Sequence, residues 1–88
     1  MRIDKFFKLS RIIKRRTEAK KACENHCVKI NGKFTKAGNL IKPLDKVEIH
    51  FRNKVLEIEV VEIPEGNVSV SRSSQLYRVV KEEKTERD

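Results

Sequence analysis

Positively charged side chains recur at short intervals along the first quarter of this chain. Residues 1–21 contain nine Lys or Arg and only Asp4 and Glu18 as acids, an excess of +7, while the whole 88-residue chain carries +8. This concentration indicates a polyanionic partner, because each phosphate that a base neutralises also releases condensed counterions. The residues expected to contact phosphates are Arg2, Lys5, Lys8, Arg11, Lys14, Arg15, Arg16 and Lys20, together with Lys42 in a later turn.

The arginines of this set should contribute more than the lysines. A planar guanidinium can hold a phosphate with two parallel hydrogen bonds and can stack on an exposed base, whereas a lysine acts as a mobile point charge. We therefore give most weight to Arg2, Arg11, Arg15 and Arg16. The alternative is a solvated helix face that only keeps the protein in solution, and the scarcity of acids that could pair with these bases argues against it.

Other kinds of site find weaker support. Cys23, His26, Cys27 and His50 offer the thiols and imidazoles that zinc prefers, but Cys-x-x-x-Cys with one distant histidine is a weak spacing for a metal. Two cysteines favour reduced thiols, and we expect Cys23 in the core. No catalytic triad, carboxylate pair or glycine-rich phosphate loop can be proposed, and Asp4 should be an ion-pair acceptor or a helix N-terminal partner. We predict no enzyme activity, no metal and no cofactor.

The spacing of apolar residues predicts two helices that would present the bases. A helical stripe over residues 3–13 comprises Ile3, Phe6, Phe7, Leu9, Ile12 and Ile13. A second helix is expected from about Arg16 to Asn25, with Ala19 and Cys23 facing inward and Thr17 as a candidate cap.

After the second helix the apolar residues alternate as in strands. Val28 and Ile30 precede Asn31-Gly32, a pair typical of a tight hairpin turn, and the chain returns through Phe34, whose ring we expect in the core. A turn at 42–45 leads into alternating runs at 47–51 and 56–60, and the alternation slips at Val60-Val61, which indicates a bulge or a strand end. Residues 64–67 form a loop, 68–74 have no clear pattern, and 76–80 could add a last strand.

These elements predict an α+β fold, with two helices packed on a small, mostly antiparallel sheet of about four or five strands. A chain of 88 residues can bury one modest core, so we expect a single domain over residues 1–80 and a flexible charged tail over 81–88. No stretch approaches the ~20 apolar residues of a membrane span, and no secretory signal follows Met1. We therefore expect a monomeric cytoplasmic protein without a membrane partner.

Four ordered motifs over residues 1–51 resemble the S-four RNA-binding domain, a family named for a small-subunit ribosomal protein. The family's first helix is matched by Arg2-Ile-Asp-Lys-Phe-Phe7, its second by Arg16-Thr-Glu-Ala-Lys20, its hairpin by Val28-Lys-Ile-Asn-Gly-Lys33 and its later turn by Ile41-Lys-Pro-Leu-Asp-Lys-Val47. The resemblance implies the S-four-like (alpha-L) RNA-binding fold and RNA contact by Arg2 and Arg16. The chain departs at Arg15, where a Ser or Thr cap is usual, and at Leu44, where Gly is usual; we expect Leu44 to alter only the turn type.

The segments Leu9–Thr17 and Tyr77–Glu83 are similar to the RqcP type of short S-four protein. This resemblance implies binding to stalled large ribosomal subunits, contact with large-subunit ribosomal RNA and peptidyl-tRNA together, and support of C-terminal alanine tailing with RqcH. A near alternative is the heat-shock S-four protein that recycles blocked subunits without tailing. Two further classes are a helix-turn-helix DNA-binding protein and an accessory domain of an RNA-modifying enzyme. A hairpin directly after the second helix argues against the former, and the length leaves no catalytic partner for the latter.

Overall fold

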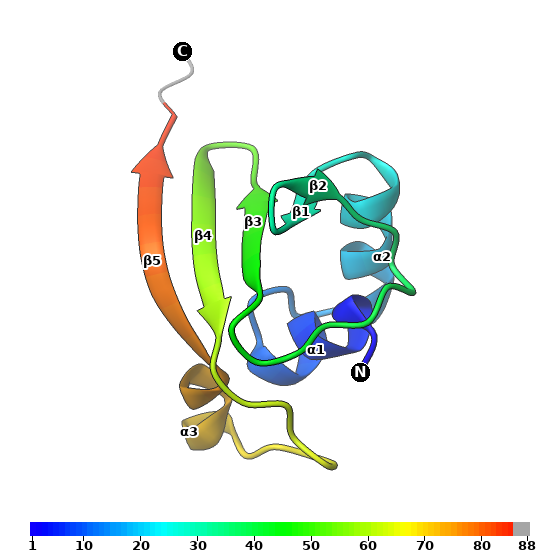
Figure 1. The fold of residues 1–88 in the computed structure, drawn as a ribbon, viewed down its shortest axis with the longest axis vertical. Coiled ribbons are helices and arrows are strands. Elements are labelled where there is room, and N and C mark those ends of the chain that lie inside the picture. The colour runs from blue at the N-terminus through cyan, green and yellow to red at the C-terminus, as the bar shows by residue number, and fades with distance from the viewer. Residues whose placement is uncertain (86–88) are drawn as a thin grey trace.

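The computed structural model describes residues 1–85 as a five-stranded sheet with helices against it (Figure 1). In chain order the elements are α1 (Ile3–Ser10), α2 (Arg16–Glu24), β1 (Val28–Ile30), β2 (Lys33–Phe34), β3 (Lys46–His50), β4 (Lys54–Val60), α3 (Val70–Ser73), the 3-10 helix η1 (Ser74–Leu76) and β5 (Tyr77–Lys84). The strand order is β2-β1-β3-β4-β5, and every neighbouring pair is antiparallel. The predicted α+β class is confirmed. Among these residues no helix is long and apolar enough to span a membrane.

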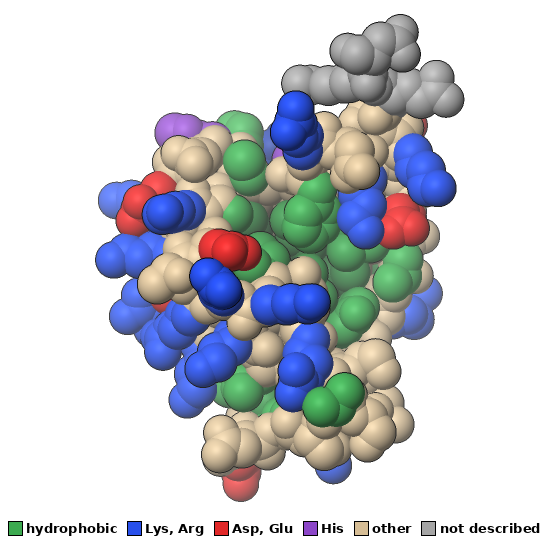
Figure 2. All heavy atoms as spheres, turned by 180° about the vertical axis from the view of Figure 1, so that it is seen from behind, with side chains coloured by type: hydrophobic (Ala, Val, Ile, Leu, Met, Phe, Trp, Pro, Cys, Tyr) green, Lys and Arg blue, Asp and Glu red, His purple; other side chains and the backbone are tan. Residues whose placement is uncertain are grey.

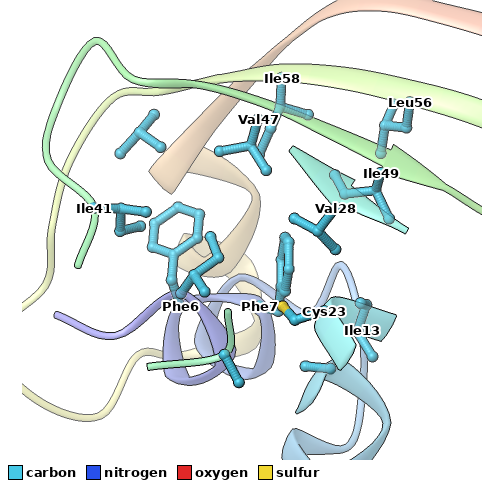
Figure 3. Close-up of a cluster of buried hydrophobic side chains, with 14 of the residues drawn as sticks. Phe6, Phe7, Ile13, Cys23, Val28, Ile41, Val47, Ile49, Leu56 and Ile58 are labelled. Carbon is cyan, nitrogen blue, oxygen red and sulfur yellow. The ribbon is translucent and has the colours of Figure 1, made fainter. Parts of the chain in front are cut away.

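Aromatic and aliphatic side chains between α1 and the sheet form the core (Figure 3). Phe6 and Phe7 of α1 are fully buried and point toward the sheet, where Val47 and Ile58 lie. Full burial of one such side chain stabilises the fold by roughly 1.5–3 kcal/mol. Because α1 and the sheet share this core, the position of α1, and with it that of Arg2 immediately before it, is fixed.

Helix α1 ends earlier than the apolar spacing predicts. Its last residue is Ser10, and Arg11 takes a φ of 61°, the left-handed conformation that commonly closes a helix. The Arg11 amide donates to the Lys8 carbonyl at 3.1 Å, and the Ile13 amide donates to the Phe7 carbonyl at 3.3 Å. Ile13 therefore reaches the core from the connection between α1 and α2, and Arg11 lies at the start of that connection.

Helix α2 begins at Arg16, as predicted, and buries Ala19 and Cys23. The residue at the N-cap position is Arg15, whose side chain makes no capping hydrogen bond. Thr17 lies inside the first turn, so the prediction that it caps the helix is wrong. The start of α2 thus keeps unpaired amides beside a run of cationic side chains.

The predicted hairpin is present, but its aromatic residue is not in the core. Asn31 and Gly32 have φ values of 51° and 85°, as a tight hairpin turn between β1 and β2 requires. Phe34 is 56% exposed, so its predicted burial is wrong. The reason is the strand order, since β2 is a two-residue strand at the edge of the sheet and both of its residues face solvent.

The turn before β3 keeps an unusual backbone at Leu44. Its φ is 76°, a conformation that favours glycine, although the side chain is 75% exposed and packs on little. The leucine has therefore not moved the turn away from a glycine conformation, contrary to our expectation. Further along, the slip in alternation at Val60-Val61 coincides with the end of β4, as predicted.

The last strand is longer than predicted. β5 extends from Tyr77 to Lys84 and pairs with β4 along its length, with one register shift between Glu57 and Ile58. Residues 81–84, expected to belong to a flexible tail, are therefore part of the sheet; the end of that tail, 86–88, lies outside the described residues. The segment without a clear pattern folds as α3 and η1.

Candidate nucleic-acid interface

A buried carboxylate gathers two of the predicted arginines. The side chain of Asp4 is 3% exposed, and its Oδ2 lies 3.3 Å from Arg2 Nη2 and 3.4 Å from Arg16 Nε. The arginine side chains are themselves 48% and 44% exposed. Asp4 is thus the ion-pair acceptor that the sequence predicted, and it serves two partners from different elements. One negative charge between two guanidinium groups leaves a net positive charge and exposed N–H donors at this point.

The backbone around Arg2 explains why it meets α2. Arg2 forms an isolated antiparallel bridge with Leu40, and the Ile3 amide donates to the Asn39 carbonyl at 2.8 Å. The loop before β3 therefore holds the residues that precede α1. Asp4 lies in the first turn of α1, where the helix dipole favours an anion.

Two shallow hollows collect most of the predicted bases. The first, of about 270 Å³, is lined by Arg2, Asp4, Arg16, Thr17 and Lys20. The second, of about 300 Å³, is lined by Lys8, Leu9, Arg11, Lys14, Asn67 and Val68. The helical half of the molecule, at the left and lower centre of Figure 2, accordingly displays many Lys and Arg side chains and few acidic ones.

The remaining predicted residues are exposed but join neither hollow. Lys5 lies on α1 and Arg15 at the start of α2. Lys42 lies in the turn before β3, where its Nζ is 3.3 Å from Asp45 Oδ1. The structure therefore brings together six of the nine predicted bases, in two groups, and leaves these three outside them.

The acidic strand residues do not neutralise this surface. Glu59 accepts a hydrogen bond from Arg78 at 2.9 Å, and Glu62 is bonded to Arg72. Arg72 lies on the short helix α3 and Arg78 on β5, so neither belongs to α1 or α2. Within residues 1–85, the only bases on α1, on α2 or at their N-cap positions that form an ion pair are Arg2 and Arg16, both with Asp4. The cations of the helices are therefore available to an external anion.

The cysteines show no sign of chemistry. Burial, followed by the charges of Asp4 and Glu24, raises the pKa of Cys23 to about 11, so its thiol stays protonated at neutral pH. Both Cys23 and Cys27 are free thiols. In the described part of the chain, His, Cys, Asp and Glu side chains form no group of three that could hold a metal.

Sequence reasoning missed one feature of this region. A larger hollow, of about 490 Å³, adjoins the first and is lined by both Arg2 and Lys20, and it also contains Phe34, His26 and Lys36. The hairpin sequence could have indicated that Phe34 is exposed, because an aromatic residue on a short strand after Asn-Gly can lie at the edge of a sheet.

The geometry suits recognition of a folded phosphate backbone. Guanidinium groups fixed by a buried carboxylate offer charge-assisted hydrogen bonds in a defined direction, and the lysines around them add charge that adapts to the shape of the ligand.

Curated proteins from several bacteria are similar to this chain over nearly its whole length. A protein named RQC P-site tRNA stabilizing factor from Halalkalibacterium halodurans is 45% identical over 94% of this chain and 93% of its own length. Proteins of the same name from Bacillus subtilis and Streptococcus pneumoniae are each 38% identical, over 96% and 98% of this chain and 96% and 97% of their own. No family model matches the chain.

Two solved structures share the fold. Vibrio cholerae heat shock protein 15, described as a trimer, superposes with a TM-score of 0.82 at 22% identity, over 91% of this chain and 81% of that one. The solution structure of a hypothetical protein, HP1423, gives a TM-score of 0.73 at 27% identity and covers both chains completely. The fold and its basic helices define a protein of the S-four-like class. Within that class, the chain belongs to the family of RQC P-site tRNA stabilizing factors, the RqcP type.

Proposed function

We propose that this protein binds large-subunit ribosomal RNA and peptidyl-tRNA together on a stalled large ribosomal subunit and holds the tRNA in the P site. Its relatives are named for stabilising P-site tRNA, and they match this chain at up to 45% identity over nearly its full length. The role places the protein in the cytoplasm.

The observation that carries the proposal is the pair of arginines on Asp4. Arg2 precedes α1 and Arg16 begins α2, and both side chains reach the same Asp4 oxygen, so a single RNA backbone can contact both at the N-terminal ends of the two helices. The second cluster, at Lys8, Arg11 and Lys14, provides a separate contact. A protein with two cationic clusters can bridge two RNA surfaces.

The mechanism is differential binding without a covalent step. A factor that binds better when the tRNA occupies one position than any other raises the population of that position by the difference in binding free energy. Recognition would follow RNA shape and phosphate positions rather than base sequence. A tRNA held in this way would support C-terminal alanine tailing of the nascent chain by RqcH.

The heat-shock alternative, recycling of blocked subunits without tailing, rests on a resemblance of fold. The Vibrio cholerae protein is 22% identical to this chain, whereas the RqcP-type relatives reach 38–45%. We therefore favour the tailing role and separate the two by the assay below.

The test is co-sedimentation with large ribosomal subunits that carry peptidyl-tRNA. The Arg2→Ala/Arg16→Ala double variant should bind at least tenfold more weakly, because each hydrogen bond between charged groups contributes about 1.5–3 kcal/mol. The matched control is Arg52→Ala/Arg78→Ala, which removes the same charge from the exposed connection between β3 and β4 and from β5, and should bind as the wild type does.

A parallel reaction with purified RqcH and alanyl-tRNA measures the product. The arginine double variant should reduce alanine tailing in proportion to its loss of binding, with an unchanged circular dichroism spectrum. An equal loss of binding in both double variants would contradict the proposal, because binding would then depend only on overall charge. Normal binding without any stimulation of tailing by the wild type would favour the recycling role.

A further inference from the structure

One hollow in the described chain lies between α2 and the segment that follows β2. Its volume is about 490 Å³, within the range of roughly 300–1,000 Å³ that is usual for small-molecule sites. Lys20 and Glu24 line it from α2, Phe34 and Lys36 from β2 and the following segment, and Arg2 from the start of the chain. The predicted phosphate contacts account for Arg2 and Lys20 but not for the rest of this hollow.

Phe34 is an aromatic ring held in solvent. Phe34 is 56% exposed, although phenylalanine side chains usually contribute to a hydrophobic core. Lys29 Nζ lies 4.8 Å from the ring centroid, and the His26 ring meets it at a centroid distance of 5.3 Å and an interplanar angle of 79°. These contacts fix the ring without covering it, so the exposure is built into the fold.

The backbone at His26 closes α2 and leaves the imidazole beside Phe34. His26 follows the C-cap residue Asn25 and has a φ of 58°, the left-handed conformation that commonly closes a helix. Glycine would adopt this conformation without strain, but it would remove the imidazole that contacts Phe34.

The charges around the ring pair favour an anion. Arg2, Lys20 and Lys36 line the hollow, against Glu24 as its one carboxylate. Arg2 and Lys20 also line the smaller hollow with Arg16, so the aromatic pair is continuous with the arginines that Asp4 holds. A phosphate bound at Arg2 therefore belongs to a nucleotide that can reach Phe34.

We propose that this hollow binds one unpaired RNA nucleotide, with its base stacked on the exposed Phe34 ring and its phosphate against Arg2 and Lys20. The inference rests on the RNA binding proposed above and adds a requirement that backbone recognition alone does not have, namely a base outside a helix. Every base has a flat face that can stack on an aromatic ring, so the site would accept any base that a loop, bulge or strand end supplies.

The experiment compares two RNA probes in fluorescence titrations. One is a single-stranded heptaadenylate with 2-aminopurine at its centre, whose fluorescence is quenched on stacking; the other is a blunt, fully paired RNA duplex of twelve base pairs. Phe34→Leu should weaken binding of the single strand about tenfold and abolish the quenching, since stacking of one base contributes roughly 1–3 kcal/mol. Phe34→Trp should preserve both, and neither variant should change binding of the duplex.

The control removes apolar surface elsewhere. Val79 on β5 is 51% exposed, so Val79→Ala should leave both probes unaffected. Equal affinity of wild type and Phe34→Leu for the single strand, or quenching that persists in Phe34→Leu, would overturn the inference while the proposed function stands. Equal weakening on both probes would also overturn it, because Phe34 would then act through the fold. Failure of the wild type to bind either RNA would instead overturn the proposed function.

Discussion

The helical half and the sheet half of this protein hold similar numbers of bases but use them differently. Residues 1–21 carry nine Lys or Arg, and residues 45–88 carry eight. In the sheet half the bases are matched by ten acids. Up to residue 85, four of these bases form ion pairs with acids: Lys54 with Glu82, Arg72 with Glu62, Arg78 with Glu59 and Lys81 with Glu83. In the first 21 residues, the described ion pairs all involve Asp4.

This difference teaches which cations are available for binding. A base paired across neighbouring strands must lose its carboxylate partner before it can contact a phosphate, whereas a free base gives up only water and counterions. Surface pairs such as those of the sheet contribute little stability, but they cancel the local potential. We infer that the sheet half supports the fold and the helical half attracts the ligand, and the predictions below test this division.

The largest expected effect comes from charge reversal in the helical half. Lys20→Glu should weaken RNA binding by tenfold or more, because it places a carboxylate beside Arg2 in both hollows that the two residues share. Lys81→Glu makes the same change on β5, where Lys81 is 65% exposed and paired with Glu83, and should change binding less than twofold. Filter binding of labelled large-subunit ribosomal RNA at fixed salt measures both. If the two reversals weaken binding equally, the division into halves is wrong.

Removal of the buried Asp4 carboxylate should have a smaller effect on RNA affinity. The higher net charge alone would raise the affinity, but we expect it to fall. Asp4→Asn raises the net charge by one, but it releases Arg2 and Arg16 from their shared acceptor. We expect RNA affinity to fall about threefold to tenfold, since the guanidinium groups lose their fixed orientation. Glu59→Gln, which frees Arg78 on the sheet, is the matched control and should leave affinity unchanged.

The same titrations decide between geometry and charge. A rise in affinity for Asp4→Asn would mean that the arginines act only through the overall potential. Thermal unfolding of each variant, read by circular dichroism, separates a loss of orientation from a loss of fold.

Much of the fold could be predicted because its signals are local. The helical period at Phe6 and Phe7, the Asn31-Gly32 turn and the alternation in β3 and β4 each lie within a few residues of sequence. The positions that sequence reasoning placed wrongly depend on the finished fold. Phe34 is exposed because β2 became an edge strand, and residues 81–84 are ordered because β4 offered a free edge, neither of which a local pattern records.

The candidate site divides in the same way. The presence of many basic residues in the first quarter of the chain could be predicted, because net charge can be counted directly from the sequence. Which bases gather could not, because Arg2 meets Arg16 only after the loop near Leu40 pairs with the start of the chain. Arg11 likewise joins Lys14 only because α1 stops at Ser10.

A change at Leu44 should alter stability and leave binding intact. Leu44→Gly relieves a left-handed backbone that costs a non-glycine residue roughly 1–2 kcal/mol, offset by about 0.4–1 kcal/mol from the greater freedom of glycine in the unfolded chain. We expect a net gain of up to about 1 kcal/mol in the free energy of unfolding. Leu40→Gly is the control: Leu40 is similarly exposed, at 71%, but has no positive φ and should lose stability. Denaturant unfolding measures both, and a loss of stability in Leu44→Gly would contradict the argument.

The smallest effect concerns acid stability and the turn that supports β3. Burial acts to raise the pKa of Asp45, but hydrogen bonds from Asn31 and from the Lys42 amide, both 3.0 Å long, together with the Lys42 charge, lower it below its usual value of 3.8. The unfolded chain therefore binds more protons than the folded one in this range, so the stability that Asp45 contributes is present above about pH 4 and is lost as the pH falls through the lowered value. Asp45→Asn should unfold at a lower temperature than the wild type at pH 7, with the difference narrowing by pH 3.

The control for this change is Glu65→Gln, in the exposed loop at 64–67, which should leave the wild-type slope of melting temperature against pH unchanged. A constant difference between Asp45→Asn and the wild type across the pH range would show that the Asp45 carboxylate acts only as a hydrogen-bond acceptor in the turn. A narrowing difference would assign part of the stability of the sheet half to this one ionised group, while the cations of the helical half stay free for RNA.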